Sequence, residues 1–158
     1  MNKSIQQWLN EYGESHQNPL NKSIHWICVP LIMLSLIGLI YTIPYQISFS
    51  LNNNYYSINW AIIFLSLLSL FYFKLSKSLF VGMIIVSIGM VYAVQFLSTL
   101  ELAMWKSCLI IFALSWIGQF IGHKIEGKKP SFFEDIQFLL IGPAWLLSFI
   151  YKKLNIPL

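Results

Sequence analysis

Four apolar runs divide this sequence and limit the folds that it can adopt. They cover residues 24–43, 59–73, 79–98 and 104–122. Each run is long enough, or nearly so, to cross about 30 Å of hydrocarbon as a helix. A bilayer core offers the backbone no hydrogen-bonding partner, so a chain of this kind crosses it as helices. The sequence therefore predicts an all-α fold, a polytopic membrane helical bundle with four transmembrane helices.

The composition agrees with a membrane protein. Of the 158 residues, 57% are hydrophobic and 10% are charged, whereas soluble domains carry about 25% charged residues. The net charge of +4 comes from lysines without any arginine, and in a membrane protein such an excess reports the orientation of loops. We therefore expect membrane lipids rather than nucleic acid as partners, and a single integral membrane domain over residues 1–158.

The first 15 residues predict a helix that lies on the membrane surface. Apolar residues recur at helical spacing through residues 3–15, opposite a polar face. Pro19 disfavours helical geometry at the preceding residue, so this helix is expected to stop near His16.

The last apolar stretch, residues 132–151, is harder to interpret. Gly142-Pro143 interrupts it, and Lys152 and Lys153 follow it. A fifth crossing would leave both lysines outside, against the charge bias. We therefore expect a broken, re-entrant segment, or a helix along the interface.

The distribution of lysine predicts the orientation of the protein. The loop at 44–57 has no lysine, whereas lysines occur near the N-terminus, at 74–78 and at 124–129. Those lysine-bearing segments should face the cytoplasm, and four crossings then place all three histidines on that side. The Lys-, Asn- and Ile-rich usage suggests an AT-rich bacterial genome, and hence a bacterial inner membrane.

The three histidines lie at the ends of apolar runs and are candidate metal ligands. His16 and His25 are nine residues apart, which is about 180° around a continuous helix, so one helix does not direct both at one ion. The turn at Pro19 removes this objection. Three neutral imidazoles and a carboxylate suit iron(II), zinc or manganese. We predict a metal site formed by His16, His25, His123 and Glu126.

Polar residues beside the histidines are candidate catalytic groups. Gln119, His123 and Glu126 are spaced i, i+4 and i+7, so they share one face of a helix that continues past the bilayer. We expect Asn21 and Gln119 to orient the imidazoles. Glu126, Gln119 and Asn21 are therefore the predicted catalytic residues.

Spacing leaves other interpretations open. A histidine at a membrane interface is more often a hydrogen-bonded surface residue than a ligand, and Glu126 has Lys129 within reach for a surface ion pair. Haem held between His25 and His123 is another alternative, but it gives His16 no role.

Two spaced motifs surround these residues. They are Tyr12-x3-His16-x4-Asn21-x3-His25-x4-Pro30 and Trp116-x2-Gln119-x2-Gly122-His123-x2-Glu126-x3-Pro130. With the length and the order of apolar runs, they resemble the membrane 2-hydroxy-fatty-acid dioxygenases over nearly the whole chain. The sequence departs from that family at Cys28, where glycine is common, and at Ser131, where alanine is common.

This resemblance implies an iron(II)-dependent α-oxidation, in which a 2-hydroxy fatty acid and O2 give the fatty acid one carbon shorter. It carries over His16, His25 and His123 as the motif histidines and Glu126 as the motif acid. We further expect Lys22, Lys124 or Lys128 to offset the charge of the substrate carboxylate.

Two other classes of function are compatible with the apolar runs. One is a non-catalytic metal-binding or structural membrane protein, in which small residues of the third run support helix packing. The other, a transporter, is disfavoured because no ionisable residue lies at mid-membrane. The sequence leaves the oligomeric state open, and a homo-oligomer is compatible with it.

Overall fold

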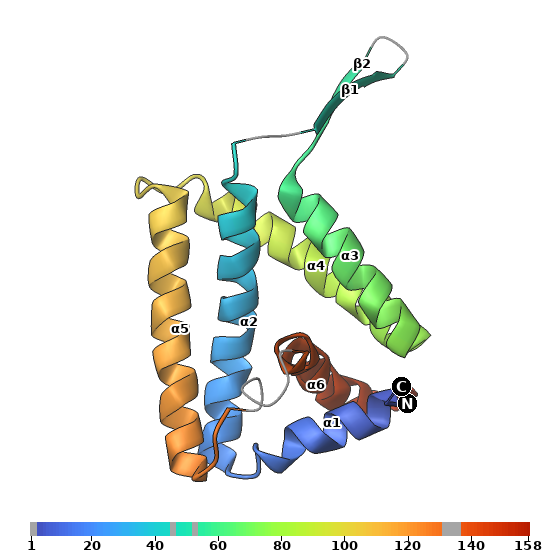
Figure 1. The fold of residues 1–158 in the computed structure, drawn as a ribbon, viewed down its shortest axis with the longest axis vertical. Helices are drawn as coiled ribbons and strands as arrows, with labels where there is room; N and C mark the ends of the chain where they lie inside the picture. Colours follow the sequence, from blue (N-terminus) through green and yellow to red (C-terminus); the bar gives the residue numbers. More distant parts are fainter. Residues whose placement is uncertain (1–2, 45–46, 52–53, 131–136) are drawn as a thin grey trace.

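The computed structural model describes residues 3–44, 47–51, 54–130 and 137–158. Within these ranges the chain forms helices and one β-hairpin (Figure 1). In chain order the elements are α1 (Ile5–Glu14), α2 (Pro19–Tyr41), β1 (Ile47–Leu51), β2 (Asn54–Ile58), α3 (Trp60–Leu75), α4 (Lys77–Leu97), α5 (Met104–Glu126) and α6 (Phe138–Lys153).

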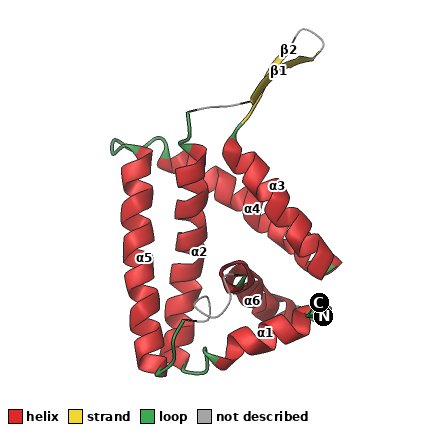
Figure 2. Cartoon of the chain, viewed as in Figure 1, coloured by secondary structure: helices red, strands yellow, loops and turns green. Residues whose placement is uncertain are grey.

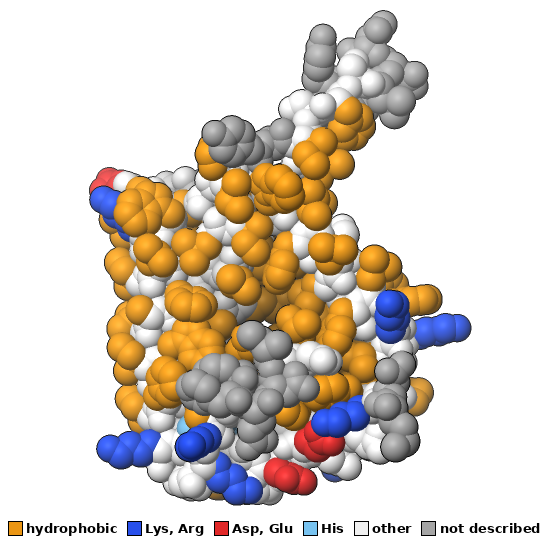
Figure 3. Space-filling view, viewed as in Figure 1, with side chains coloured by type: hydrophobic (Ala, Val, Ile, Leu, Met, Phe, Trp, Pro, Cys, Tyr) orange, Lys and Arg blue, Asp and Glu red, His pale blue; other side chains and the backbone are white. Residues whose placement is uncertain are grey.

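Within the described ranges, three helices are long and apolar enough to cross a membrane. They are α2, α4 and α5, with 23, 21 and 23 residues, so each is about 31–35 Å long. The apolar helix α3 has 16 residues and is about 24 Å long, which is short of a full hydrocarbon core. Figure 3 shows hydrophobic side chains over most of one face, with most of the visible lysines and acidic residues towards the α1 end. The helical, membrane-type fold is as predicted, whereas three helices of the described residues, not the predicted four, are long enough to span.

The loop predicted between the first two apolar runs contains a β-hairpin. Strands β1 and β2 pair antiparallel, with Ile47 opposite Ile58 (Figure 2). The hairpin extends beyond the helices at the end opposite α1 and α6 (Figure 1). Residues 47–51, Ile-Ser-Phe-Ser-Leu, alternate apolar and polar residues, which is a strand pattern. The all-α prediction left out this element.

Helix α1 covers α6 at the other end of the molecule. The helix begins at a capping box, in which the Ser4 side chain accepts from the Gln7 backbone N–H and Gln7 accepts from that of Ser4. Its apolar face, Trp8, Leu9 and Tyr12, packs with residues of α6 in one buried cluster. The predicted amphipathic helix therefore has a protein partner for part of its apolar face.

Helix α6 continues through Gly142-Pro143, so the described part of this segment differs from the predicted broken segment and leaves the alternative, a helix along the interface, as a prediction. A proline inside a helix removes one backbone hydrogen bond and crowds the preceding turn. The Tyr72 hydroxyl donates to the Leu140 carbonyl oxygen in that turn, at 2.6 Å, and the Tyr151 hydroxyl donates to Ser78, also at 2.6 Å. These bonds fix α6 to α3 and α4. Residues 132–136 of the predicted segment lie outside the described residues.

Helices α2 and α5 pack side by side along their lengths (Figure 1). Cys108 of α5 lies against Gly38 of α2, and Cys28 of α2 lies against Gly118 of α5. Small residues at a helix contact allow the two backbones to approach closely. This approach brings the start of α2 next to the end of α5, where His25 and His123 lie.

Gly82 provides a test of how α6 docks on α4. A Cβ atom at Gly82 would lie 2.7 Å from Leu147 Cδ2 and would also collide with the Tyr151 hydroxyl. We expect Gly82→Ala to lower the stability in detergent by about 1–3 kcal/mol, the usual cost of overpacking. The measurement is thermal unfolding followed by circular dichroism.

Gly89→Ala is the matched control on the same helix. A Cβ at Gly89 meets no described atom within 4 Å, so this variant should be neutral or up to about 1 kcal/mol more stable. Equal melting temperatures for the two variants would contradict the docking of α6 described above.

Candidate metal centre

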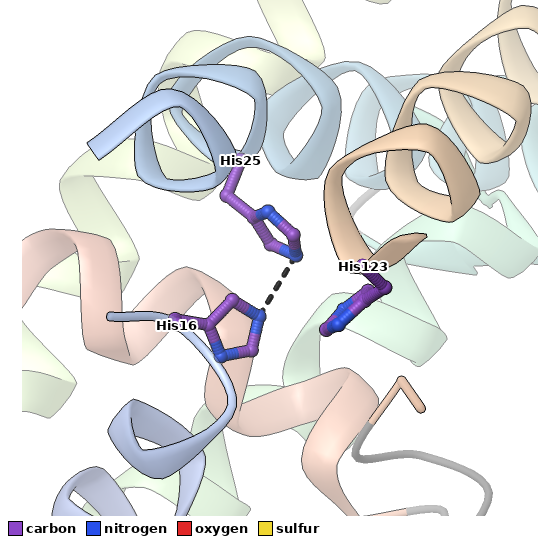
Figure 4. Close-up of side chains that lie close together, drawn as sticks. All are labelled: His16, His25 and His123. Atoms are coloured by element: carbon purple, nitrogen blue, oxygen red, sulfur yellow. Dashed lines mark hydrogen bonds between the residues drawn. The ribbon is translucent and has the colours of Figure 1, made fainter. Parts of the chain in front are cut away.

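Three histidines from separate parts of the fold meet beside the end of α5. His16 lies in the turn after α1, His25 lies in the second turn of α2, and His123 lies in the last turn of α5. One ring nitrogen from each lies within 4.8 Å of the others (Figure 4). All three side chains are buried, with His16 and His25 fully inaccessible to solvent. The structure thus brings together the three histidines that the sequence predicted as ligands.

The hydrogen bonds of His16 and His25 determine which ring nitrogens lack a proton. His16 Nδ1 lies against the Tyr12 carbonyl oxygen, and His25 Nδ1 lies 2.9 Å from the Asn21 carbonyl oxygen. A carbonyl oxygen only accepts, so each Nδ1 carries the proton and each neutral ring has a bare Nε2. These two Nε2 atoms face each other at 2.8 Å. Two lone pairs so placed need a cation, or a shared proton, between them.

The third histidine leaves a further nitrogen unsatisfied. His123 Nδ1 is buried and has no hydrogen-bond partner among the described residues. Buried polar atoms without a partner are rare in native proteins, and an absent ion is one common reason. The donor set therefore fits a divalent metal held by neutral imidazoles.

The electrostatics keep the cluster neutral. Burial, and after it the adjacent His25, lower the pKa of His16 to about 3. At neutral pH this ring is therefore uncharged, and its lone pair is available to a metal. The rings of His25 and His123 are 5.0 Å apart, edge to face, which leaves no space for a porphyrin between them.

Glu126 holds the turn that carries His16. Its carboxylate accepts from the backbone N–H groups of Gln17 and Asn18, both at 2.8 Å, and from Asn21 Nδ2 at 3.1 Å. The sequence predicted Glu126 as a ligand and catalytic group. The structure places it one turn after His123, with both oxygens bonded to the turn before α2.

Asn21 joins the same arrangement from α2. Its Nδ2 also donates to the Ser15 carbonyl oxygen at 3.2 Å, and its Oδ1 lies against Gly122. Asn18 caps α2 by accepting from the backbone N–H of Leu20, and Pro19 occupies the first helical position. The residues between His16 and the start of α2 thus form a tight turn that is hydrogen-bonded to the end of α5.

An apolar cavity of about 280 Å³ opens beside the cluster. Residues of α2, α3, α5 and α6 line it, and His16 and His123 reach it from one end. Gln119 also lines the cavity, is 5% exposed, and has no described partner for its buried Nε2. The predicted catalytic residue Gln119 therefore faces the space next to the histidines.

The three predicted substrate lysines lie around the cluster. Lys22 lines a second, more open pocket that His16 also reaches. Lys128 Nζ donates to the Glu14 carbonyl oxygen at 2.8 Å, so it caps α1. Lys124 is exposed at the end of α5. None of these lysines is among the described residues that line the apolar cavity.

Sequence reasoning missed two aromatic contacts of His16. Tyr12 stacks on the imidazole with ring centroids 4.2 Å apart, and Trp145 of α6 packs against it at 5.2 Å. Tyr12 stands four residues before His16, a spacing that brings side chains together on a helix. Trp145 is 129 positions away, and no local pattern in the sequence links it to the site.

Comparison with known proteins agrees with the motifs. A family model described as "2-hydroxy-palmitic acid dioxygenase Mpo1-like" matches residues 2–154. The chain belongs to this Mpo1-like family. It is also similar to the 2-hydroxy-palmitic acid dioxygenase MPO1 of Saccharomyces cerevisiae, with 27% identity over 149 residues, 91% of this chain and 78% of the yeast protein. No solved structure matches. The resemblance that the sequence motifs indicated is confirmed, and the histidine cluster described above is that of a member of the Mpo1-like family.

Removing the Glu126 carboxylate tests its role in this cluster. We expect Glu126→Ala to weaken metal binding about 10- to 100-fold, because the turn that carries His16 loses three hydrogen bonds. The measurement is titration with cobalt(II), whose visible spectrum also reports the ligands. Glu101→Ala, at an exposed position in the loop before α5, is the control.

At saturating cobalt(II) the spectrum of the Glu126→Ala variant should match the wild type. A changed spectrum at saturation would instead make Glu126 a ligand, and unchanged affinity would exclude both roles.

Proposed function

We propose that this protein is an iron(II)-dependent dioxygenase that converts long-chain 2-hydroxy fatty acids to fatty acids one carbon shorter. The observation that carries the proposal is the convergence of three buried imidazoles at the end of an apolar cavity. The names of the family and of its yeast member supply the reaction class.

His16, His25 and His123 are the residues that would hold the ion. When bound, iron(II) supplies open positions for O2 and for substrate oxygens. The carbonyl oxygens of Tyr12 and Asn21 hold the first two rings in the tautomer that offers Nε2. Tyr12 and Trp145 pack on His16 and limit its rotation.

The chemistry requires cleavage of the bond between C1 and C2 of the substrate. Oxidation of C2 to a carboxyl group, with release of C1 as carbon dioxide and of one water, balances with one O2 and needs no other reductant. The buried cluster excludes bulk water from this bond. A fixed arrangement of reacting groups lowers the barrier by reducing the entropy lost on the way to the transition state.

Gln119 is suited to bind the polar head of the substrate. Its unpartnered Nε2 lies in the cavity lining, one helical turn before His123. An amide N–H there donates to a carboxylate or hydroxyl oxygen of the substrate and limits its rotation. Lys22, Lys124 and Lys128 add positive charge around the histidine cluster, where they attract the carboxylate.

We further propose that the shorter helix α3 makes a fourth membrane crossing beside α4, and that α1 and α6 lie near the membrane interface. Helices α1 and α6, the start of α2 and the end of α5 lie at the end of the bundle opposite the hairpin (Figure 1), and the histidine cluster lies there with them. From the lysines at this end and the positive-inside rule, we infer that it faces the cytoplasm. The carboxylate of a fatty acid dissolved in the membrane lies at the headgroup level, which is the proposed depth of the histidine cluster.

Metal analysis tests the proposal. We expect protein purified in detergent without oxygen to contain about one iron per chain, and His16→Ala/His123→Ala to contain none and to lose turnover of 2-hydroxypalmitate. The measurements are elemental analysis and detection of the shortened acid. Glu101→Gln serves as the control.

Other results would support other functions. Zinc in the wild type would favour a non-catalytic metal-binding protein, and no metal in either protein would favour a structural one. Iron and full turnover in the double variant would contradict the assignment of these histidines.

Gln119→Leu tests substrate binding without a large change of volume. A hydrogen bond to a charged group contributes about 1.5–3 kcal/mol, so kcat/KM should fall about 10- to 100-fold while the iron content stays the same. Gln95→Leu, at an exposed position on α4, is the matched control. Loss of iron from the Gln119 variant would show that this residue supports the metal site instead of the substrate.

A further inference from the structure

The cavity beside the histidines is polar at one end. The polar side chains that reach it there come from the last turn of α1, from the turn after α1, and from the last two turns of α5. They are Tyr12, His16, Gln119 and His123. Together they provide ring nitrogens, an amide N–H and a phenol within a small space. A ligand that fits this end has a small, oxygen-rich head group.

The rest of the cavity is apolar. Its lining continues along α2 through Val29 and Met33 to Leu36, and along α5 through Trp116 to Phe112. The one tyrosine hydroxyl in this part, on Tyr72, already donates to the Leu140 carbonyl oxygen. A ligand with one polar end and one hydrocarbon chain matches this distribution.

The length of the cavity corresponds to one leaflet of a bilayer. On α5, the lining runs from His123 back to Phe112, which is eleven residues earlier. Eleven residues of α-helix cover about 16 Å. The hydrocarbon core of a bilayer is about 30 Å thick, so one leaflet accounts for about 15 Å. A chain that lies in the cavity thus extends from the headgroup level to near the midplane.

Three side chains from three helices mark the apolar end. They are Leu36 of α2, Phe64 of α3 and Phe112 of α5. Phe64 belongs to this end because it lies eight residues, or about 12 Å, from Tyr72, which is bonded to α6. Leu36 is 39% exposed on the isolated chain, so the end is bounded by side chains and by lipid together.

We propose that this cavity holds the acyl chain of the substrate along one leaflet, and that Leu36, Phe64 and Phe112 set the chain length that it accepts. The identity of the head group rests on the proposed function, whereas the placement of the chain rests on the cavity itself. The chain leaves lipid for the cavity, so the preference for a chain length comes from close packing against the cavity wall and from steric limits at its end. Beyond the three residues an added methylene enters lipid and gains nothing.

Chain-length profiles test the three residues. The substrates are 2-hydroxy acids shorter than, equal to and longer than 2-hydroxypalmitate, assayed with iron-loaded protein. We expect Phe64→Ala and Phe112→Ala to move the optimum of kcat/KM to longer chains, because each substitution removes a ring that limits the end of the cavity. Leu36→Trp should move it to shorter chains.

Matched substitutions that face lipid are the controls. Phe96→Ala on α4 and Leu114→Trp on α5 change residues that are 67% and 63% exposed and do not line the cavity. These variants should keep the wild-type profile. Identical profiles in all variants would overturn the proposal.

A second measurement does not depend on turnover. A palmitic acid with a photoreactive diazirine at its methyl end should crosslink to peptides that contain Leu36, Phe64 or Phe112. The same group near the carboxyl end should crosslink near Trp116 and Gln119. Crosslinks spread evenly over the lipid-facing surface of α4 would overturn the placement of the chain. If these crosslinks form but no 2-hydroxy acid is converted, the cavity holds an acyl chain and the proposed function fails.

Discussion

Two unprotonated imidazole nitrogens that face each other at 2.8 Å are the constraint on which this site depends. The constraint arises from the backbone, because the Tyr12 and Asn21 carbonyl oxygens take the only proton of each neutral ring. Lone pairs in this position repel unless a cation lies between or beside them. With the unpartnered His123 Nδ1, the site has the electronic character of a metal centre.

The surrounding structure holds this arrangement from three directions. Close packing of α2 on α5, through glycine and cysteine, brings His25 and His123 together. Glu126 then fixes the turn after α1, so that His16 reaches the same point. Helix α6 closes the site, because Trp145 packs on His16 and the tyrosine hydroxyls hold α6 on α3 and α4. Each contact joins segments that are far apart in the chain.

The sequence could predict the parts of this site that have local signals. Apolar runs indicate membrane-length helices, Pro19 indicates the turn between His16 and His25, and the motifs around the histidines indicate the family. The role of Glu126 could not be read in this way, because a carboxylate near histidines has the same sequence pattern whether it binds a metal or a backbone N–H. The contact of Trp145 with His16 also has no sequence signal, since it depends on how α6 folds back on α1.

The two ends of the molecule differ in a way that suits a substrate dissolved in the membrane. At one end lie the histidines, α1, α6 and lysines, while the hairpin lies at the other (Figure 1). An amphiphile aligned with the leaflet brings its head group to the histidine end without turning over. Its chain exchanges lipid neighbours for the side chains of the cavity, so burial of the chain adds little free energy. Selectivity for the head group must then come from the few polar atoms at that end of the cavity. Apart from the imidazole nitrogens, Gln119 Nε2 is the buried polar atom of the described lining that has no described hydrogen-bond partner.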